Sequence, residues 1–228
     1  NYITLMGDLG ATLKRGANDE MLRVTGDRCS ILNLRFDGNK ANFATANSVV
    51  IISSDYNLID NCEIFNGTGH GLHLDGTSLS CDFNRIHNCI LHENDLDGLD
   101  INTADDCFIT SNYIYSNSIN GITCSTSLRN RIVGNKVDSN CVTASGVANI
   151  SFDNGSSTIV SDNHIVSAGN GRPGLRTQDN SGNSSVCIIS NNRFVSNGGW
   201  GIHIFNGSFA GVPTANSIIG NNFSGNTS

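Results

Sequence analysis

The stretch Gly98-Leu99-Asp100-Ile101 decides the fold, because its pattern of glycine, aliphatic, polar and apolar residue returns along the chain. The clear copies are Gly71-Leu72-His73-Leu74, Gly121-Ile122-Thr123-Cys124 and Gly201-Ile202-His203-Ile204, with weaker copies at Gly146-Val147 and Gly174-Leu175. The mean spacing of about 26 residues is typical of stacked structural repeats. Looser copies near Leu22 and Val49 bring the series to about eight units.

A second feature recurs inside each unit, namely an aliphatic residue, two spacers, Asn, one spacer and an apolar residue. It is found at Ile109-x-x-Asn112-x-Ile114, Ile132-x-x-Asn135-x-Val137, Val160-x-x-Asn163-x-Ile165, Ile189-x-x-Asn192-x-Phe194 and Ile218-x-x-Asn221-x-Phe223. In two earlier units Cys62 and Cys89 take the place of the Asn. Short alternating runs broken by Asn, Gly and Ser predict strands joined by bends. Each unit is too small to bury its own apolar face, so the units must stack, and the Asn amides then hydrogen-bond between neighbouring coils.

Composition narrows the fold and the partners. The 228 residues include 25 Gly, 2 Pro and 8 Cys, only 14% are charged, and the formal net charge is −7. Glu and Lys are scarce, which argues against helical bundles and doubly wound α/β folds. The acidic balance argues against nucleic acid as a partner, and no apolar run reaches the roughly 18 residues of a membrane span.

The repeat resembles the right-handed parallel β-helix of the pectate-lyase-like superfamily, which includes polysaccharide lyases, glycoside hydrolases, epimerases and phage tailspikes. The resemblance predicts an all-β solenoid of about eight coils, as a single domain over residues 1–228. The opening Ile3-Thr4-Leu5-Met6-Gly7 looks like a second coil, and the capping helix usual in that superfamily is missing. Since solenoids need caps, we expect the chain to be a fragment of a longer protein.

Most of the cysteines occupy inward positions of the repeat, where Cys packs as a small hydrophobic residue. We therefore expect reduced, buried thiols. Cys62 and Cys89 lie one coil apart, which leaves a disulfide between them as an alternative. Cys141 falls on a turn and is predicted to be the most exposed thiol. No Cys-x-x-Cys pair points to zinc.

Stacking brings titratable side chains of neighbouring coils together on the outer face. Aligning the glycine-led strands places His73 over Asp100, and Asp75 over Asn102. Asp75 and Asp100 are then separated by on the order of 8 Å, within the roughly 6.5–9.5 Å that inverting glycosidases use. The carboxylate of Asp100 is expected to favour the imidazolium form of His73. The catalytic candidates are therefore Asp75, Asp100 and His73. An ordinary solvated ladder of polar side chains is the alternative.

Further residues on the same face are candidates for substrate binding. They are His70, Asp97, Asn102, Arg176, Trp200 and His203. Trp200 offers a ring on which a sugar can stack, and arginine suits a carboxylate-bearing polymer. A lyase needs a group that neutralises a uronate, for which Ca²⁺ held by Asp75, Asp97 and Asp100 is one hypothesis.

These observations favour an extracellular or virion-associated protein that binds, and as a lyase or glycoside hydrolase cleaves, a polysaccharide, with an acidic polymer as one candidate. A non-catalytic stalk, adhesin or surface-structure protein is the main alternative. A periplasmic β-helix that assists metal-cofactor insertion is a weaker one. The resemblance to tailspikes also raises a homotrimer, for which the sequence carries no clear trace.

Overall fold

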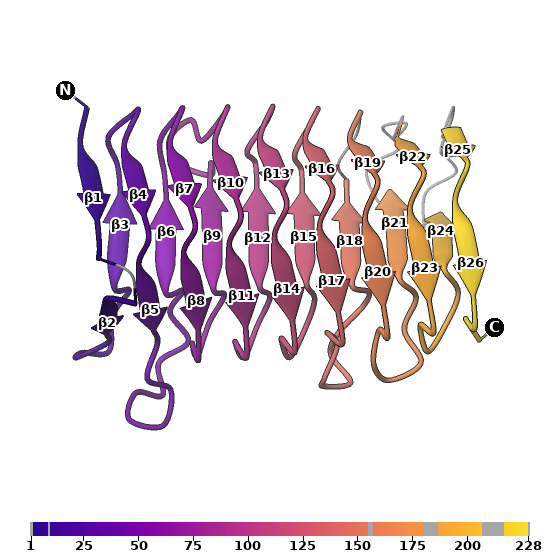
Figure 1. Ribbon diagram of the computed structural model, residues 1–228, viewed down its shortest axis with the longest axis horizontal. Helices are drawn as coiled ribbons and strands as arrows, with labels where there is room; N and C mark the ends of the chain where they lie inside the picture. Colours follow the sequence, from indigo (N-terminus) through magenta and orange to yellow (C-terminus); the bar gives the residue numbers. More distant parts are fainter. Residues whose placement is uncertain (1, 9, 155–156, 180–186, 207–216, 228) are drawn as a thin grey trace.

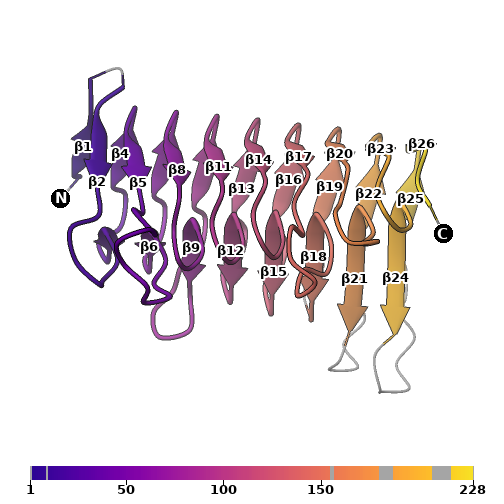
Figure 2. The same ribbon diagram turned by 90° about the horizontal axis from the view of Figure 1, so that it is seen from below.

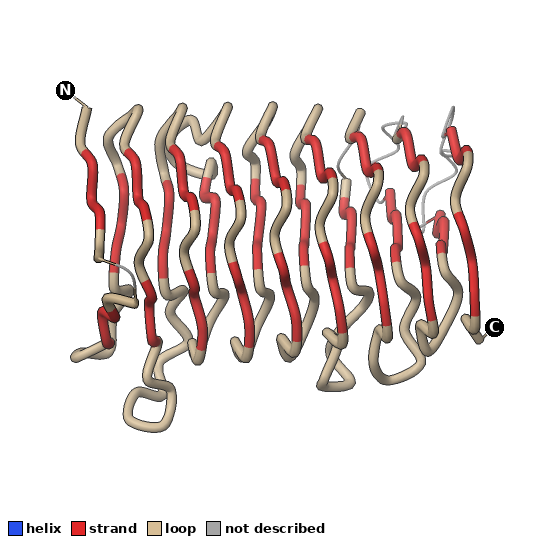
Figure 3. Tube along the Cα trace, in the orientation of Figure 1, coloured by secondary structure: helices blue, strands red, loops and turns tan. Residues whose placement is uncertain are grey.

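The computed structural model is a long stack of similar coils, seen from the side in Figure 1 and from below in Figure 2. It describes residues 2–8, 10–154, 157–179, 187–206 and 217–227. Within these residues the structure contains 26 strands and no helix (Figure 3), and so nothing that could serve as a membrane-crossing helix.

The strands form three parallel sheets, and the chain visits each sheet once per coil. Sheet A contains β1(Thr4–Met6), β4(Ser30–Leu32), β7(Leu58–Asp60), β10(Arg85–His87), β13(Phe108–Thr110), β16(Arg131–Val133), β19(Ile159–Ser161), β22(Ile188–Ser190) and β25(Ser217–Ile219). Sheet B contains β2(Thr12–Lys14), β5(Arg35–Asp37), β8(Glu63–Phe65), β11(Ile90–His92), β14(Tyr113–Tyr115), β17(Lys136–Asp138), β20(His164–Val166), β23(Arg193–Val195) and β26(Asn222–Ser224). Sheet C contains β3(Leu22–Val24), β6(Val50–Ile52), β9(Leu72–Asp75), β12(Leu99–Asn102), β15(Ile122–Ser125), β18(Ile150–Asp153), β21(Leu175–Asp179) and β24(Ile202–Asn206).

The glycine-led repeat forms sheet C, and its copies pair in register. Leu99 is the partner of Leu72 on one side and of Ile122 on the other. All three side chains are completely buried. The prediction that equivalent residues of successive units become vertical neighbours around a common interior is therefore confirmed.

The predicted asparagine ladder is present inside the bend between sheets A and B. The Nδ2 of Asn112 donates to the Oδ1 of Asn135 at 3.0 Å, and Asn135 donates to Asn163 at 3.0 Å. Asn163 and Asn192 continue the chain of amides as far as Asn221. Each oxygen also accepts the backbone N–H of the preceding Asn. The ladder thus satisfies polar groups that burial would otherwise leave unpaired.

All eight cysteines are reduced and buried, as expected for thiols that fill the stack. The thiols of Cys62 and Cys89 occupy adjacent rungs without a disulfide. The prediction that Cys141 is the most exposed thiol is wrong, because its exposed fraction is 0%. Cys141 lies on a turn with a left-handed backbone, but Gly146 and Gly169 fold directly onto it.

Candidate functional site

Two neighbouring strands of sheet C carry the predicted acid and histidine residues. Alternation along β9 buries Leu72 and Leu74 and turns His73 and Asp75 outward. In β12, Asp100 lies beside His73 and Asn102 lies beside Asp75. The alignment derived from the sequence therefore agrees with the pairing in the structure. The predicted offset between Asp75 and Asp100, one strand and two residues, is also present.

Four side chains form one cluster, which we call the His–Asp cluster: His70, His73, Asp97 and Asp100. The Nε2 of His73 lies 3.3 Å from the Oδ2 of Asp100, but it is not aligned for a hydrogen bond. The Nε2 of His70 lies 3.8 Å from the same oxygen. The Nδ1 of His70 lies 3.4 Å from the Oδ2 of Asp97. The buried carboxyl of Asp100, which is 8% exposed, is thus approached by two imidazoles.

The pKa values of Asp100 and of the nearby Asp75 are shifted in opposite directions. Burial raises the pKa of Asp100 to about 6, although His70 acts in the opposite direction. Burial also tends to raise the pKa of Asp75, but hydrogen bonds from Thr77 outweigh it and hold that pKa below its ordinary value. Two carboxyl groups on adjacent strands therefore differ in pKa. Such a split is typical of a general acid working with a general base.

The expectation that Asp100 favours the imidazolium of His73 is not met. Burial, and then the neighbouring charge of His70, lower the pKa of His73 to about 4. Burial also acts to lower the pKa of His70, but its hydrogen bond to Asp97 and the charge of Asp100 raise it above the ordinary value. Proton binding in the cluster is therefore shifted toward the imidazole of His70, whereas His73 stays neutral near pH 7.

Sequence reasoning missed Asn120, which holds the cluster from the next coil. Its backbone N–H donates to the Oδ1 of Asp97 at 2.8 Å, and its Nδ2 donates to the Oγ1 of Thr123 at 3.0 Å. The signal was present in the sequence. His70, Asp97 and Asn120 each directly precede the glycine of a repeat, so the three residues occupy the same corner of successive coils.

The remaining substrate-binding candidates lie further along sheet C. Arg176 is three rungs from Asp100, a separation of roughly 14 Å at the usual strand spacing, and is the strand partner of His203. The ring of Trp200 is half-exposed and lies 4.4 Å from the ring of His203. These three residues form a second group, which the structure does not bring into the His–Asp cluster.

Sheet B carries another titratable group that sequence reasoning did not identify. Glu63 accepts hydrogen bonds from Arg35 and, at 3.0 Å, from the Nε2 of His92. The imidazole of His92 stacks between the rings of Phe65 and Tyr115, both within 3° of parallel. The signal for this row is the aromatic residue at the same place of three successive units.

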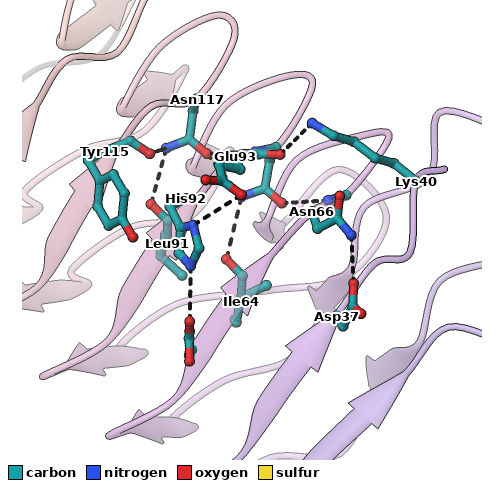
Figure 4. A network of polar contacts seen from close by, with 12 residues as sticks. Asp37, Lys40, Ile64, Asn66, Leu91, His92, Glu93, Tyr115 and Asn117 are labelled. Atoms are coloured by element: carbon teal, nitrogen blue, oxygen red, sulfur yellow. Dashed lines mark hydrogen bonds and ion pairs between the residues drawn. The ribbon is translucent and has the colours of Figure 1, made fainter.

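Lys40, in the loop after β5, bridges to the bend that follows β11 (Figure 4). The Nζ of Lys40 donates to the carbonyl oxygen of Glu93 at 2.8 Å and to Asp95 at 2.9 Å. Asn66 donates to Asp37 at 2.8 Å in the same region. Lys40 thereby ties its loop to a coil two turns further along the stack.

Two models of known protein families match the sequence. The family model described as right handed beta helix region matches residues 15–137, and the model described as periplasmic copper-binding protein (NosD) matches residues 79–228, each more than half of the chain. The chain belongs to the right-handed β-helix and NosD families. The β-helix predicted from the repeat is therefore confirmed. No curated protein matches the sequence.

Solved structures with a similar fold include an alginate epimerase, a tailspike protein and an alginate lyase. The periplasmic alginate epimerase AlgG has a TM-score of 0.67 at 16% identity, over 86% of this chain and 45% of that one. The Dettilon tailspike protein has a TM-score of 0.64 at 14% identity, over 86% and 42%. The alginate lyase from Paenibacillus sp. has a TM-score of 0.59 at 11% identity, over 98% and 92%. The β-helix described here spans less than half the length of the first two proteins.

The described residues do not fit a metal centre. No group of three or more His, Cys, Asp or Glu side chains among them is placed to hold a metal ion, whether copper or calcium. The Ca²⁺ site considered at Asp75, Asp97 and Asp100 is therefore not supported. The physical reason is that Asp97 is engaged by Asn120 and His70, and Asp75 by Thr77.

Proposed function

We propose that this protein binds an extended polysaccharide along the outer face of sheet C and cleaves it at Asp75, Asp100 and His73. One observation carries the proposal: the raised pKa of Asp100 beside a carboxyl, that of Asp75, whose pKa is lowered. The similarity in fold to an alginate epimerase and an alginate lyase supports a polysaccharide as the substrate class.

The split pKa values suit hydrolysis of a glycosidic bond. Protonated Asp100 gives its proton to the glycosidic oxygen as the bond to the anomeric carbon breaks. Ionised Asp75 takes a proton from the water whose oxygen bonds to that carbon. His70, whose pKa is raised, and neutral His73 hold the Asp100 carboxyl between them. Arg176, Trp200 and His203 contact the polymer further along the sheet, with Asn102 and Asp97 beside the reacting groups.

A lyase reaction is the second candidate, and the state of His73 favours it. The Nε2 of His73 is buried without a hydrogen-bond partner, and its pKa of about 4 leaves it unprotonated at neutral pH. A neutral imidazole can accept the proton that β-elimination removes beside a uronate carboxyl group. The two reactions call for opposite pH profiles. Hydrolysis declines above about pH 6 as Asp100 ionises, whereas elimination rises through about pH 4 and persists above it.

The deciding experiment incubates the protein with neutral and uronate-containing polysaccharides, and follows reducing ends and unsaturated-product absorbance in parallel. Asp100→Asn should lower the rate by about 10²–10⁴-fold, the usual contribution of a general acid or base. Asp162→Asn, the same substitution at an exposed bend between sheets A and B, away from sheet C, is the matched control and should leave the rate unchanged. Retained activity in folded Asp100→Asn would refute the assigned site. Binding without any product would favour the non-catalytic stalk or adhesin.

A location outside the cytoplasm is part of this proposal, because a polysaccharide of this kind is met at the cell surface. The NosD family is described as periplasmic, and so is the alginate epimerase, which supports this location. Assembly as a homotrimer stays a prediction, which light scattering of the purified protein would check.

A further inference from the structure

A groove follows the bend between sheets A and B, which runs along the middle of Figure 1. It has a volume of about 360 Å³ and is lined by residues 10, 33–35, 61–63, 88 and 90 from four successive coils. We call it the corner groove. It shares no residue with the His–Asp cluster, which lies on sheet C. Its size is at the lower end of the range for small-molecule sites.

One wall of the corner groove is a ladder of side-chain amides. Asn33, Asn61 and Asn88 all adopt the left-handed backbone that the bend requires, with φ between 51° and 58°. The Nδ2 of Asn61 donates to the Oδ1 of Asn33 at 2.9 Å, and Asn88 donates to Asn61 at 3.2 Å. An amide has two N–H donors and two acceptor lone pairs. Each rung of this exposed ladder therefore keeps a second N–H and a second lone pair for a ligand.

The other wall carries charges that cancel. Arg35 donates through its Nε to Glu63, and the second oxygen of Glu63 is engaged by His92. The guanidinium of Arg35 also lies over the ring of Phe65, 5.3 Å from its centroid, which fixes its position. Within the described part of the chain its two terminal amino groups make no hydrogen bond. The wall thus offers fixed donors without net charge, next to Ile90, an aliphatic side chain that is 39% exposed.

We propose that the corner groove binds a neutral oligosaccharide, as a site separate from Asp75, Asp100 and His73 on sheet C. Hydroxyl groups along the edge of a sugar chain match the repeated amides, and its C–H surfaces match Ile90. The compensated charges of Arg35 and Glu63 favour a neutral ligand over an acidic one. An extended peptide is disfavoured, because its rise of about 3.3 Å per residue does not match rungs about 4.8 Å apart.

The test is calorimetric titration of the whole chain with cellohexaose, maltohexaose and N-acetylchitohexaose. The wild type should bind at least one of them, with little effect of salt. Asn61→Gly removes one amide but keeps the left-handed turn, and Arg35→Lys keeps the ion pair but loses the planar donor. Each should weaken binding about threefold to tenfold, as expected for the loss of one hydrogen bond. Urea unfolding of both variants confirms that they are folded.

Two control variants separate this site from the proposed function. Asn191→Gly is the same substitution at the same bend five coils away from Asn61, and it should bind like the wild type. Asp100→Asn should lose cleavage but keep the corner-groove affinity. The proposal is overturned if none of the three sugars binds, if Asn61→Gly binds as tightly as the wild type, or if an extended peptide of similar length binds equally well. None of these results depends on whether the protein cleaves a polymer.

Discussion

Replacing Asn135 by Ala should be among the most damaging single changes in this molecule. The side chain of Asn135 is 2% exposed and makes four hydrogen bonds. Its Nδ2 donates to the Oδ1 of Asn163 and to the carbonyl oxygen of Ile109. Its Oδ1 accepts from the backbone N–H and from the Nδ2 of Asn112. The substitution removes all four and leaves their partners buried.

The expected loss of stability follows from those contacts. A hydrogen bond contributes about 0.5–1.5 kcal/mol net, so four of them amount to about 2–6 kcal/mol. Partial relaxation brings the expected loss to about 3–4 kcal/mol, a large part of the stability of a typical domain. Asn135→Cys should lose less stability, because Cys62 and Cys89 occupy the equivalent position in earlier coils and donate weak S–H hydrogen bonds to backbone carbonyl oxygens.

Equilibrium unfolding in urea measures the global effect. Because stacked repeats can unfold in stages, hydrogen exchange over residues 107–115 gives a local measure of the same loss. Asn191→Gly, which changes an amide at the same bend two coils further along and whose left-handed backbone suits Gly, is the control and should change stability little. A loss below about 1 kcal/mol for Asn135→Ala, with unchanged exchange at Asn112, would show that the ladder does not stabilise the stack as argued.

Three further outcomes are expected. Asp100→Asn should be more stable than the wild type at neutral pH by about 2–3 kcal/mol, and the gap should close near pH 4. The pKa of Asp100 rises from 3.8 in the unfolded chain to about 6 in the folded one. Because the folded form keeps the proton to a higher pH, the contribution of Asp100 to stability declines as pH rises through that window. A stability difference that does not change with pH in urea unfolding would contradict this prediction. Arg15→Met should loosen the loop after β5, because Arg15 is 4% exposed and bonds to Thr68 and to the carbonyl oxygen of Thr45, and limited proteolysis should then cut residues 39–47 faster than in the wild type. A colourimetric thiol reagent should label none of the eight cysteines until denaturant is added, because all of them are buried and burial raises the pKa of thiols such as that of Cys81, to about 12; rapid labelling of the native protein would show that the stack opens.

The candidate site shows which of its features the sequence repeat could predict. The repeat predicted that His73 stands beside Asp100, because a residue two positions after each glycine must face the same way in every coil. It did not predict the protonation states. Those depend on how much water reaches each group, and burial gives His73 a pKa of about 4 while raising that of Asp100 to about 6.

The sequence alone determined the stack, its inward aliphatic rows and its asparagine ladder, because a fixed local period forces equivalent residues into contact when identical units pile up. Only the tertiary structure decided which corners close and which side chains meet across them. Cys141 is buried by Gly146 and Gly169, and Arg35 is turned toward the corner groove by Glu63. Such contacts depend on turns of unequal length between the strands, and these turns carry no period from which their packing could be predicted.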